Sequence, residues 1–249
     1  MKQLLKNLLF FSLSIFLVVF FFNKGIIATA TIVDKSDLGK NSIDSDDKFI
    51  YLTFDDGPSY HVTDKVLDIL KERDVKATFF LIGSEIRHRE AVVKRIKDEG
   101  HSIGLHTFTH KFNCIYCNDD AFIKEMIDCS EEINRVIGVS PNIIRFPGGS
   151  YKHLNNRLLQ KLHNNNLRVY DWNVDNSDGL NPNLSPYQLY RRSIKGSDKL
   201  QTVILLMHCT DMNKNTCEAL PKIIDYYKEQ GYIFKVIEED TPEMYFRIR

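Results

Sequence analysis

Two adjacent carboxylates, Asp55 and Asp56, follow an apolar stretch at residues 49–54. The stretch is rich in β-forming residues, and Gly57-Pro58 directly after the acidic pair would end a strand there. Side chains alternate between the two faces of a strand, so the two carboxylates can share one pocket only if the chain turns at them. Gly57 permits such a turn. The alternative is an acidic turn without any chemistry.

A pair of histidines follows at a spacing that suits a metal ion. His106 and His110 are four residues apart, and on a helical turn both imidazoles would lie on one side. Two neutral imidazoles and one strand-end carboxylate would leave Zn²⁺ with a net positive charge and an open coordination position. That arrangement is typical of a catalytic rather than a structural site. A histidine pair alone could also be a coincidence of the surface.

Further titratable groups stand at the ends of other expected strands. They are Arg145, Asp171 and His208. Reactive groups of parallel α/β folds collect where the strands end, so these side chains could meet the acidic pair and the histidines around one point. Each also has a structural interpretation: a salt bridge for Arg145, a strand-end cap for Asp171, and a hydrogen-bonded histidine at 208.

Apolar segments and periodic segments alternate along the chain. We expect strands at 49–54, 77–82, 102–106, 142–146, 167–172, 202–207 and 232–237. We expect helices at 63–73, 91–99, 121–137, 154–163 and 185–195, and one that ends at residue 230 after an uncertain start near Pro221. Strands that alternate with helices predict an α/β fold with parallel strands inside and helices outside, close to a (β/α) barrel.

The N-terminal residues are typical of export. Lys2 and Lys6 precede an apolar run at 8–22, so residues 1–30 are predicted to be a signal peptide or a retained membrane anchor, and residues 31–47 a polar tether. Both alternatives place the remainder outside the cell. The chain has 249 residues with 33 Lys plus Arg and 33 Asp plus Glu, so its net charge is zero and no overall field attracts nucleic acid.

The five cysteines do not indicate a metal-binding site. Cys129 lies on the apolar face of an expected helix, and we expect it in the core. Cys114 and Cys117 have metal or redox spacing, but no second pair follows to complete a zinc ribbon. Cys209 and Cys217 are predicted to form a disulfide that holds the loop of His208, with two free thiols as the alternative.

Five motifs together resemble a known family. They are Thr53-Phe54-Asp55-Asp56-Gly57-Pro58, His106-Thr107-Phe108-Thr109-His110, Arg145-Phe146-Pro147-Gly148, Asp171-Trp172 and Leu206-Met207-His208. Their order and spacing are similar to those of NodB-like polysaccharide deacetylases, carbohydrate esterase family 4. The resemblance places the catalytic domain at residues 48–240 and implies a distorted (β/α)7 barrel.

The resemblance also implies a role for each motif residue. The metal ligands would be Asp56, His106 and His110, and the metal would be Zn²⁺ or Co²⁺. Asp55 would be the general base and His208 the general acid, with Arg145 orienting Asp55 and Asp171 orienting His208. Trp172 and Leu206 would wall the acetyl pocket. The backbone N–H of Gly148, after Pro147, would complete the oxyanion hole. Family members often place an aromatic residue at the position of Gly148, so its glycine puts the sugar-facing wall in question.

The implied function is a metal-dependent hydrolase that removes N-acetyl groups from an extracellular or cell-wall glycan. Peptidoglycan N-acetylglucosamine comes first, because an exported enzyme meets the wall first, and chitin oligomers come next. We expect a monomer that contacts the membrane only through its N-terminal segment. The alternatives are an O-acetyl esterase on a xylan-like polysaccharide, a non-catalytic glycan-binding barrel, and a redox protein that uses Cys114 and Cys117.

Overall fold

Strand β1 (Lys48–Gly57) stands at the centre of a parallel sheet in the computed structural model, which describes residues 47–248. The predicted signal or anchor and nearly all of the predicted tether lie outside these residues. The other strands are β2 (Thr78–Leu81), β3 (Ser102–Leu105), β4 (Ile143–Ile144), β5 (Arg168–Val169), β6 (Val174–Asp175), β7 (Thr202–His208) and β8 (Tyr232–Lys235). No helix among residues 47–248 is long and apolar enough to span a membrane.

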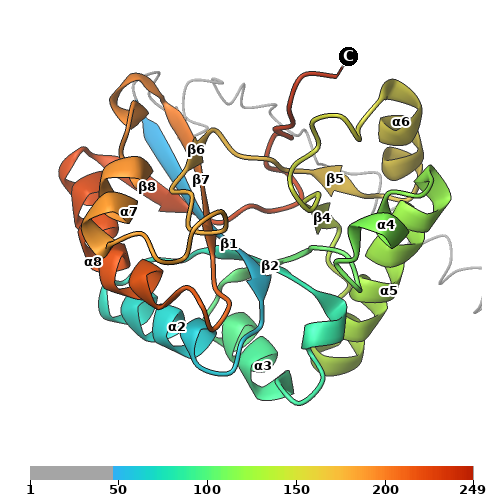
Figure 1. Ribbon diagram of the computed structural model, residues 1–249, viewed down its shortest axis with the longest axis horizontal. Coiled ribbons are helices and arrows are strands. Elements are labelled where there is room, and N and C mark those ends of the chain that lie inside the picture. The colour runs from blue at the N-terminus through green and yellow to red at the C-terminus, as the bar shows by residue number, and fades with distance from the viewer. Residues whose placement is uncertain (1–46, 249) are drawn as a thin grey trace, which may run out of the picture. The chain divides into compact units, whose positions relative to one another are not determined.

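The strand order is β5-β4-β3-β2-β1-β7-β6. Strand β1 pairs with β7 along one edge, and along the other it pairs first with β8 and then with β2. The sheet curls into part of a barrel with helices around it (Figure 1), which confirms the predicted distorted (β/α)7 architecture. The prediction missed β6, because a strand of two residues is too short to show an alternating pattern.

The outer helices are α2 (Val62–Glu72), α3 (Glu90–Asp98), α4 (Phe112–Ile115), α5 (Asp119–Ile137), α6 (Asn156–Asn164), α7 (Pro186–Ser193) and α8 (Lys214–Glu229). Two 3₁₀ turns, η1 (Gly83–Glu85) and η2 (Ser197–Lys199), complete the elements of the described residues. Helix α4 was not predicted, since one turn carries no periodic signal. Pro221, which left the start of the last helix uncertain, lies inside α8.

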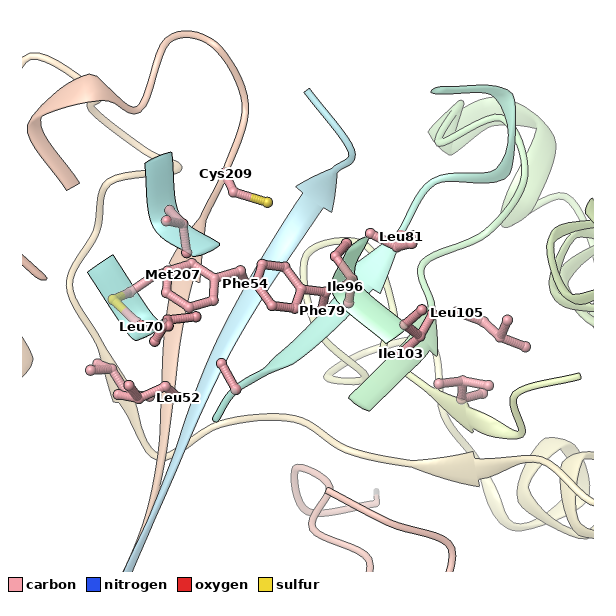
Figure 2. Packing of buried hydrophobic residues seen from close by; sticks show 14 of the residues in the cluster. Leu52, Phe54, Leu70, Phe79, Leu81, Ile96, Ile103, Leu105, Met207 and Cys209 are labelled. Atoms are coloured by element: carbon pink, nitrogen blue, oxygen red, sulfur yellow. The ribbon is translucent and has the colours of Figure 1, made fainter. Parts of the chain in front are cut away.

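The alternation of side chains along β1 and β7 separates the core from the site. Leu52 and Phe54 point outward into the apolar core beneath the helices, where the ring of Phe54 stacks on Phe79 at a centroid distance of 5.3 Å (Figure 2). The intervening residues point to the barrel interior, and that series ends at Asp55 on β1 and at His208 on β7. These two residues are direct partners in the parallel register, so the pairing of β1 with β7 brings the two polar side chains together.

The predicted disulfide between Cys209 and Cys217 is wrong, because both thiols are free. Cys209 is buried beside Phe54 (Figure 2), and its thiol faces the carbonyl oxygen of Asp55 at 3.5 Å. Cys217 is buried on α8, with its thiol 3.9 Å from the carbonyl oxygen of Val62. Both side chains pack as small apolar groups, as the fully buried Cys129 does in agreement with its prediction.

Candidate active site

A bulge at the end of β1 directs the side chains of Asp55 and Asp56 toward the same pocket. The register between β1 and β2 shifts between Asp55 and Gly57, and Asp56 itself adopts a left-handed backbone with φ of 67°. The extra residue cancels the alternation that would otherwise separate the two side chains. Their carboxylates consequently both approach His106, whose Nε2 lies 3.3 Å from Asp56 Oδ1 and 3.8 Å from Asp55 Oδ2.

Asp56, His106 and His110 form a group that could hold one metal ion. Their nearest ligand atoms all lie within 4.8 Å of one another, and His110 Nε2 is 3.3 Å from the same Asp56 oxygen. The Nδ1 atom of His106 lies 2.9 Å from the carbonyl oxygen of Arg145. Because a carbonyl only accepts, Nδ1 carries the proton and Nε2 offers its lone pair to the group. Asp56 Oδ1 is buried without a hydrogen-bond partner, so a divalent cation fits this donor set.

The electrostatics of the trio favour a cation. Burial alone would raise the pKa of Asp56, but the imidazoles that surround it, His106 first and then His208 and His110, outweigh burial and hold that pKa well below its usual range. Burial lowers the pKa of His110, and the neighbouring His106 lowers it further. The carboxylate is therefore ionised and the His110 imidazole is favoured as neutral, which are the ligand forms that a metal requires.

The loop that carries His110 is not the helical turn that the spacing suggested. Residues 107–110 form an irregular loop in which Thr107 and His110 have positive φ values of 68° and 55°. Glu125 on α5 holds it: one carboxylate oxygen accepts the backbone N–H groups of Phe108 and Thr109 at 2.9 and 2.7 Å, and the other accepts the Thr109 hydroxyl. Sequence reasoning missed Glu125, which reads as an ordinary residue of an amphipathic helix.

Arg145 is fully buried and anchors Asp55. Its guanidinium donates to Asp55 Oδ1 at 2.9 Å and to the Thr53 hydroxyl at 2.6 Å. Its remaining donors reach the carbonyl oxygens of Tyr170 and Asp171 at 2.8 and 3.0 Å. A buried charge needs hydrogen-bond partners of this kind. The result is an ionised pair in which one Asp55 oxygen is held and the other faces His106.

Asp178, which the sequence analysis missed, holds His208. Its Oδ1 lies 2.7 Å from His208 Nδ1, and its Oδ2 accepts the backbone N–H of His208 at 3.0 Å and the hydroxyl of Thr216 at 2.6 Å. Burial lowers the pKa of His208, but the hydrogen bond and charge of Asp178 outweigh it and raise that pKa to about 9, with the charges of Asp55 and Asp56 adding to the effect.

Gly179 packs directly against the His208 ring. A methyl group at this glycine would lie 2.7 Å from Nε2 and 2.8 Å from Nδ1, so no larger residue fits without moving the imidazole. Gly179 and Asp178 together hold the ring against the sheet, with Nε2 left as the nitrogen that can face a substrate.

The prediction that Asp171 orients His208 is wrong. Asp171 accepts the N–H and the hydroxyl of Ser150, and the N–H of Phe246 at 2.7 Å, all away from His208. The physical reason is strand order: Asp171 follows β5 at one edge of the sheet, whereas β7 with His208 lies beside β6. The available signal was a second pair of acids, Asp175 at the end of the short segment Val174–Asp175 and Asp178 three residues later.

The four residues expected to bind substrate lie at the same end of the strands. Leu206 is buried on β7 in register with Thr53 of β1, and the Trp172 ring lies 5.8 Å from the guanidinium of Arg145. The carbonyl oxygen of Pro147 accepts the hydroxyl of Tyr116 at 2.7 Å. Gly148 is exposed with φ of 74°, a backbone conformation that favours glycine.

A cleft of about 260 Å³ opens beside the metal-binding group. Its walls are Asp56, Pro58, Ser59, Ile82, Glu85, Arg89, His110, Thr210 and Asp211. Both Asp56 and His110 therefore face open space on one side, and a ligand can reach the group from the cleft.

Comparison with known proteins places this geometry in a family. The polysaccharide deacetylase family profile matches residues 42–170. A peptidoglycan-N-acetylglucosamine deacetylase from Bacillus cereus is 37% identical over 198 residues, 78% of this chain and 71% of that protein. A chitooligosaccharide deacetylase from Rhizobium leguminosarum bv. trifolii is 36% identical over 138 residues, 55% of this chain and 62% of that protein.

A crystal structure agrees with the sequence comparisons. A polysaccharide deacetylase from Bacillus cereus superposes on this chain with a TM-score of 0.73 at 34% identity. The superposition covers 81% of this chain and 96% of the Bacillus cereus chain. The chain belongs to the polysaccharide deacetylase family, carbohydrate esterase family 4, and is a hydrolase of the polysaccharide deacetylase class. This confirms the resemblance that the five motifs indicated.

Proposed function

We propose that this protein is a metal-dependent deacetylase that removes N-acetyl groups from N-acetylglucosamine of peptidoglycan. The observation that carries the proposal is the grouping of a metal-binding trio, an Arg-paired Asp55 and an Asp178-paired His208 at one end of the barrel. Binding alone needs no such acid–base pair, which argues against a non-catalytic barrel. The peptidoglycan deacetylase from Bacillus cereus supports the substrate class.

Asp56, His106 and His110 would hold the metal ion, with Zn²⁺ or Co²⁺ as the proposed species. Bound there, the ion would supply the positive charge that acidifies the attacking water and polarises the acetyl carbonyl. Asp55 Oδ2, the oxygen that Arg145 does not hold, takes the proton from the water. The Arg145 guanidinium keeps the carboxylate of Asp55 aimed at the pocket.

On the opposite side of the pocket, His208 donates a proton from Nε2 to the leaving nitrogen. Asp178 keeps the imidazole charged and oriented through Nδ1. The backbone N–H of Gly148 would stabilise the oxyanion, and Trp172 and Leu206 would enclose the acetyl methyl group. Each group of residues at this end of the barrel therefore has a distinct task in the proposed reaction.

The proposed location is outside the cell. Residues 1–30 would export or anchor the chain and residues 31–47 would tether it, with a monomeric domain acting on the wall. The neutral net charge supports a glycan rather than a nucleic acid as the partner.

The test measures acetate released from peptidoglycan, chitin oligomers and acetyl-xylan, with and without a chelator. The proposal predicts the highest kcat/KM on peptidoglycan, loss of activity on chelation, and recovery with Zn²⁺ or Co²⁺. Highest activity on chitin oligomers, which the rhizobial relative's name makes the second candidate, would correct the substrate. Release from acetyl-xylan alone would show an O-acetyl esterase instead, and full activity after metal removal would overturn the mechanism.

A further inference from the structure

An aromatic ring from a distant segment lies next to the glycine of the oxyanion loop. A Cβ atom at Gly148 would meet two ring atoms of Phe112, at 3.4 and 3.5 Å. Phe112 opens helix α4, which follows the loop of His110. The space beside Gly148 is therefore bordered by an aromatic side chain that another part of the chain supplies.

The Phe112 ring is exposed yet firmly placed. Half of the residue, 50%, is accessible to solvent, although large apolar side chains are usually covered. One contact is an edge-to-face arrangement with the metal-site residue His110, at a centroid distance of 5.6 Å and an angle of 78°. A second, with Tyr116, has a centroid distance of 5.7 Å and an angle of 69°. The ring thus lies at the rim of the site, two residues along the chain from the metal-site residue His110.

Tyr116 fixes the position of α4 against the oxyanion loop. Its hydroxyl donates to the carbonyl oxygen of Pro147 at 2.7 Å, and its ring stacks on His153 at 3.5 Å and on Phe122 at 5.7 Å. These contacts tie the end of α4 to the oxyanion loop at Pro147, to the chain after that loop and to helix α5. The exposed face of Phe112 is therefore preorganised, and a ligand that covers it loses little conformational entropy on binding.

We propose that Phe112 is the sugar-stacking residue of the site, and that it binds the apolar C–H face of an N-acetylglucosamine ring. The inference rests on the proposed function, because an acetyl group at the metal trio and Gly148 places its sugar ring at the rim. Aromatic side chains line ligand sites for this purpose, and a pyranose has an apolar face that matches a ring. Phe112 would then supply the sugar-facing wall that Gly148 lacks.

The experiment measures binding of the N-acetylglucosamine tetramer by calorimetry in an Asp55→Asn background, where turnover is slowed. Phe112→Ala and Phe112→Leu are each combined with that change. Both should raise Kd about three- to tenfold, the size expected for one aromatic contact. Phe112→Trp should restore the parent Kd, since it keeps a flat ring. Leucine retains apolar bulk against His110 and Gly148, so a loss shared by Ala and Leu identifies stacking.

The matched control is Tyr187→Ala, which removes another exposed aromatic ring from α7 and should leave Kd unchanged. Metal content is measured in every variant, so that a damaged metal site is recognised. Parent-like binding by Phe112→Ala, or by Phe112→Leu, overturns the inference.

The proposed function fails separately, if the unmodified enzyme releases no acetate from any N-acetylated glycan. A parent that binds no tetramer but releases acetate from peptidoglycan overturns the role of Phe112 and leaves the proposed function intact.

Discussion

The two sides of the candidate site use histidine in opposite ways. On the metal side, His106 donates Nδ1–H to a neutral backbone carbonyl, and burial lowers the pKa of His110. On the acid side, His208 Nδ1 faces the buried carboxylate of Asp178, and its pKa rises to about 9. A metal ligand must present a lone pair, whereas a general acid must carry a proton. The partner of Nδ1 therefore separates the task of His106 from that of His208.

A carboxylate outside the trio supports each side in a different manner. Glu125 accepts two backbone N–H groups and a hydroxyl from the loop of His110, and does not touch the imidazole itself. Asp178 contacts the His208 ring directly. Loss of Glu125 should consequently loosen the loop that carries His110. Loss of Asp178 should change both the position of the His208 imidazole and its pKa.

The largest effect is expected from removing the metal side. The double variant His106→Ala/His110→Ala leaves Asp56 as the only member of the trio, so bound metal should be lost and acetate release should fall to background. Metal analysis of the purified protein and an acetate assay measure the two effects. His163→Ala, a histidine on α6 that pairs with Glu243, is the control and should retain both. An unchanged metal content in the double variant would show that the ion binds elsewhere.

A smaller effect, about 10–100-fold in kcat, is expected for Asp178→Asn on the acid side. Activity requires protonated His208, so it falls as pH rises through the pKa of His208, near 9 in the unmodified protein. Loss of the Asp178 charge lowers that pKa, and the basic limb of the pH–rate profile should move to lower pH.

Asp171→Asn separates the two acids, because Asp171 contacts Ser150 and Phe246 rather than His208. The basic limb of the pH–rate profile of Asp171→Asn should remain at the pH of the unmodified protein. If Asp171→Asn moves the limb and Asp178→Asn does not, the assignment from the structure fails and the original prediction is restored.

The smallest effect is expected for Glu125→Ala, which removes three hydrogen bonds from the loop of His110. Metal affinity should fall about tenfold, and activity should return when metal is added in excess. A competition assay with a metal indicator measures the affinity. Glu131→Ala, an exposed residue on the same helix, should bind metal normally. Equal affinities in the two variants would mean that Glu125 does not position His110.

Local motifs made the metal side predictable. Asp56 lies at the end of a strong apolar strand, and His106 and His110 stand within one loop, so short spacings were enough to group them. Even there, the observed backbone differs from the predicted one. A bulge with a left-handed Asp56 stands where a turn at Gly57 was expected, and residues 107–110 form an irregular loop rather than a helical turn. The barrel itself followed from the alternation of strands and helices.

The acid side depends on contacts that a linear reading does not contain. Asp178 reaches His208 only because β6 lies beside β7, and β6 has just two residues. Asp171 was assigned to His208 through the resemblance of the Asp171-Trp172 motif to the family, but its partner Phe246 comes from the C-terminal segment beyond the predicted domain boundary at residue 240. Sheet order and long-range packing decide such pairs, and neither leaves a periodic pattern in the sequence.

The central claim is that neighbouring aspartates serve the two different tasks, with Asp56 in the metal group and Asp55 in proton transfer. Bound metal per chain in Asp55→Asn and Asp56→Asn tests it most directly. The account predicts that Asp55→Asn retains the metal, because Arg145 holds that carboxylate, and that Asp56→Asn loses it. Metal retained by Asp56→Asn and lost by Asp55→Asn would contradict the account.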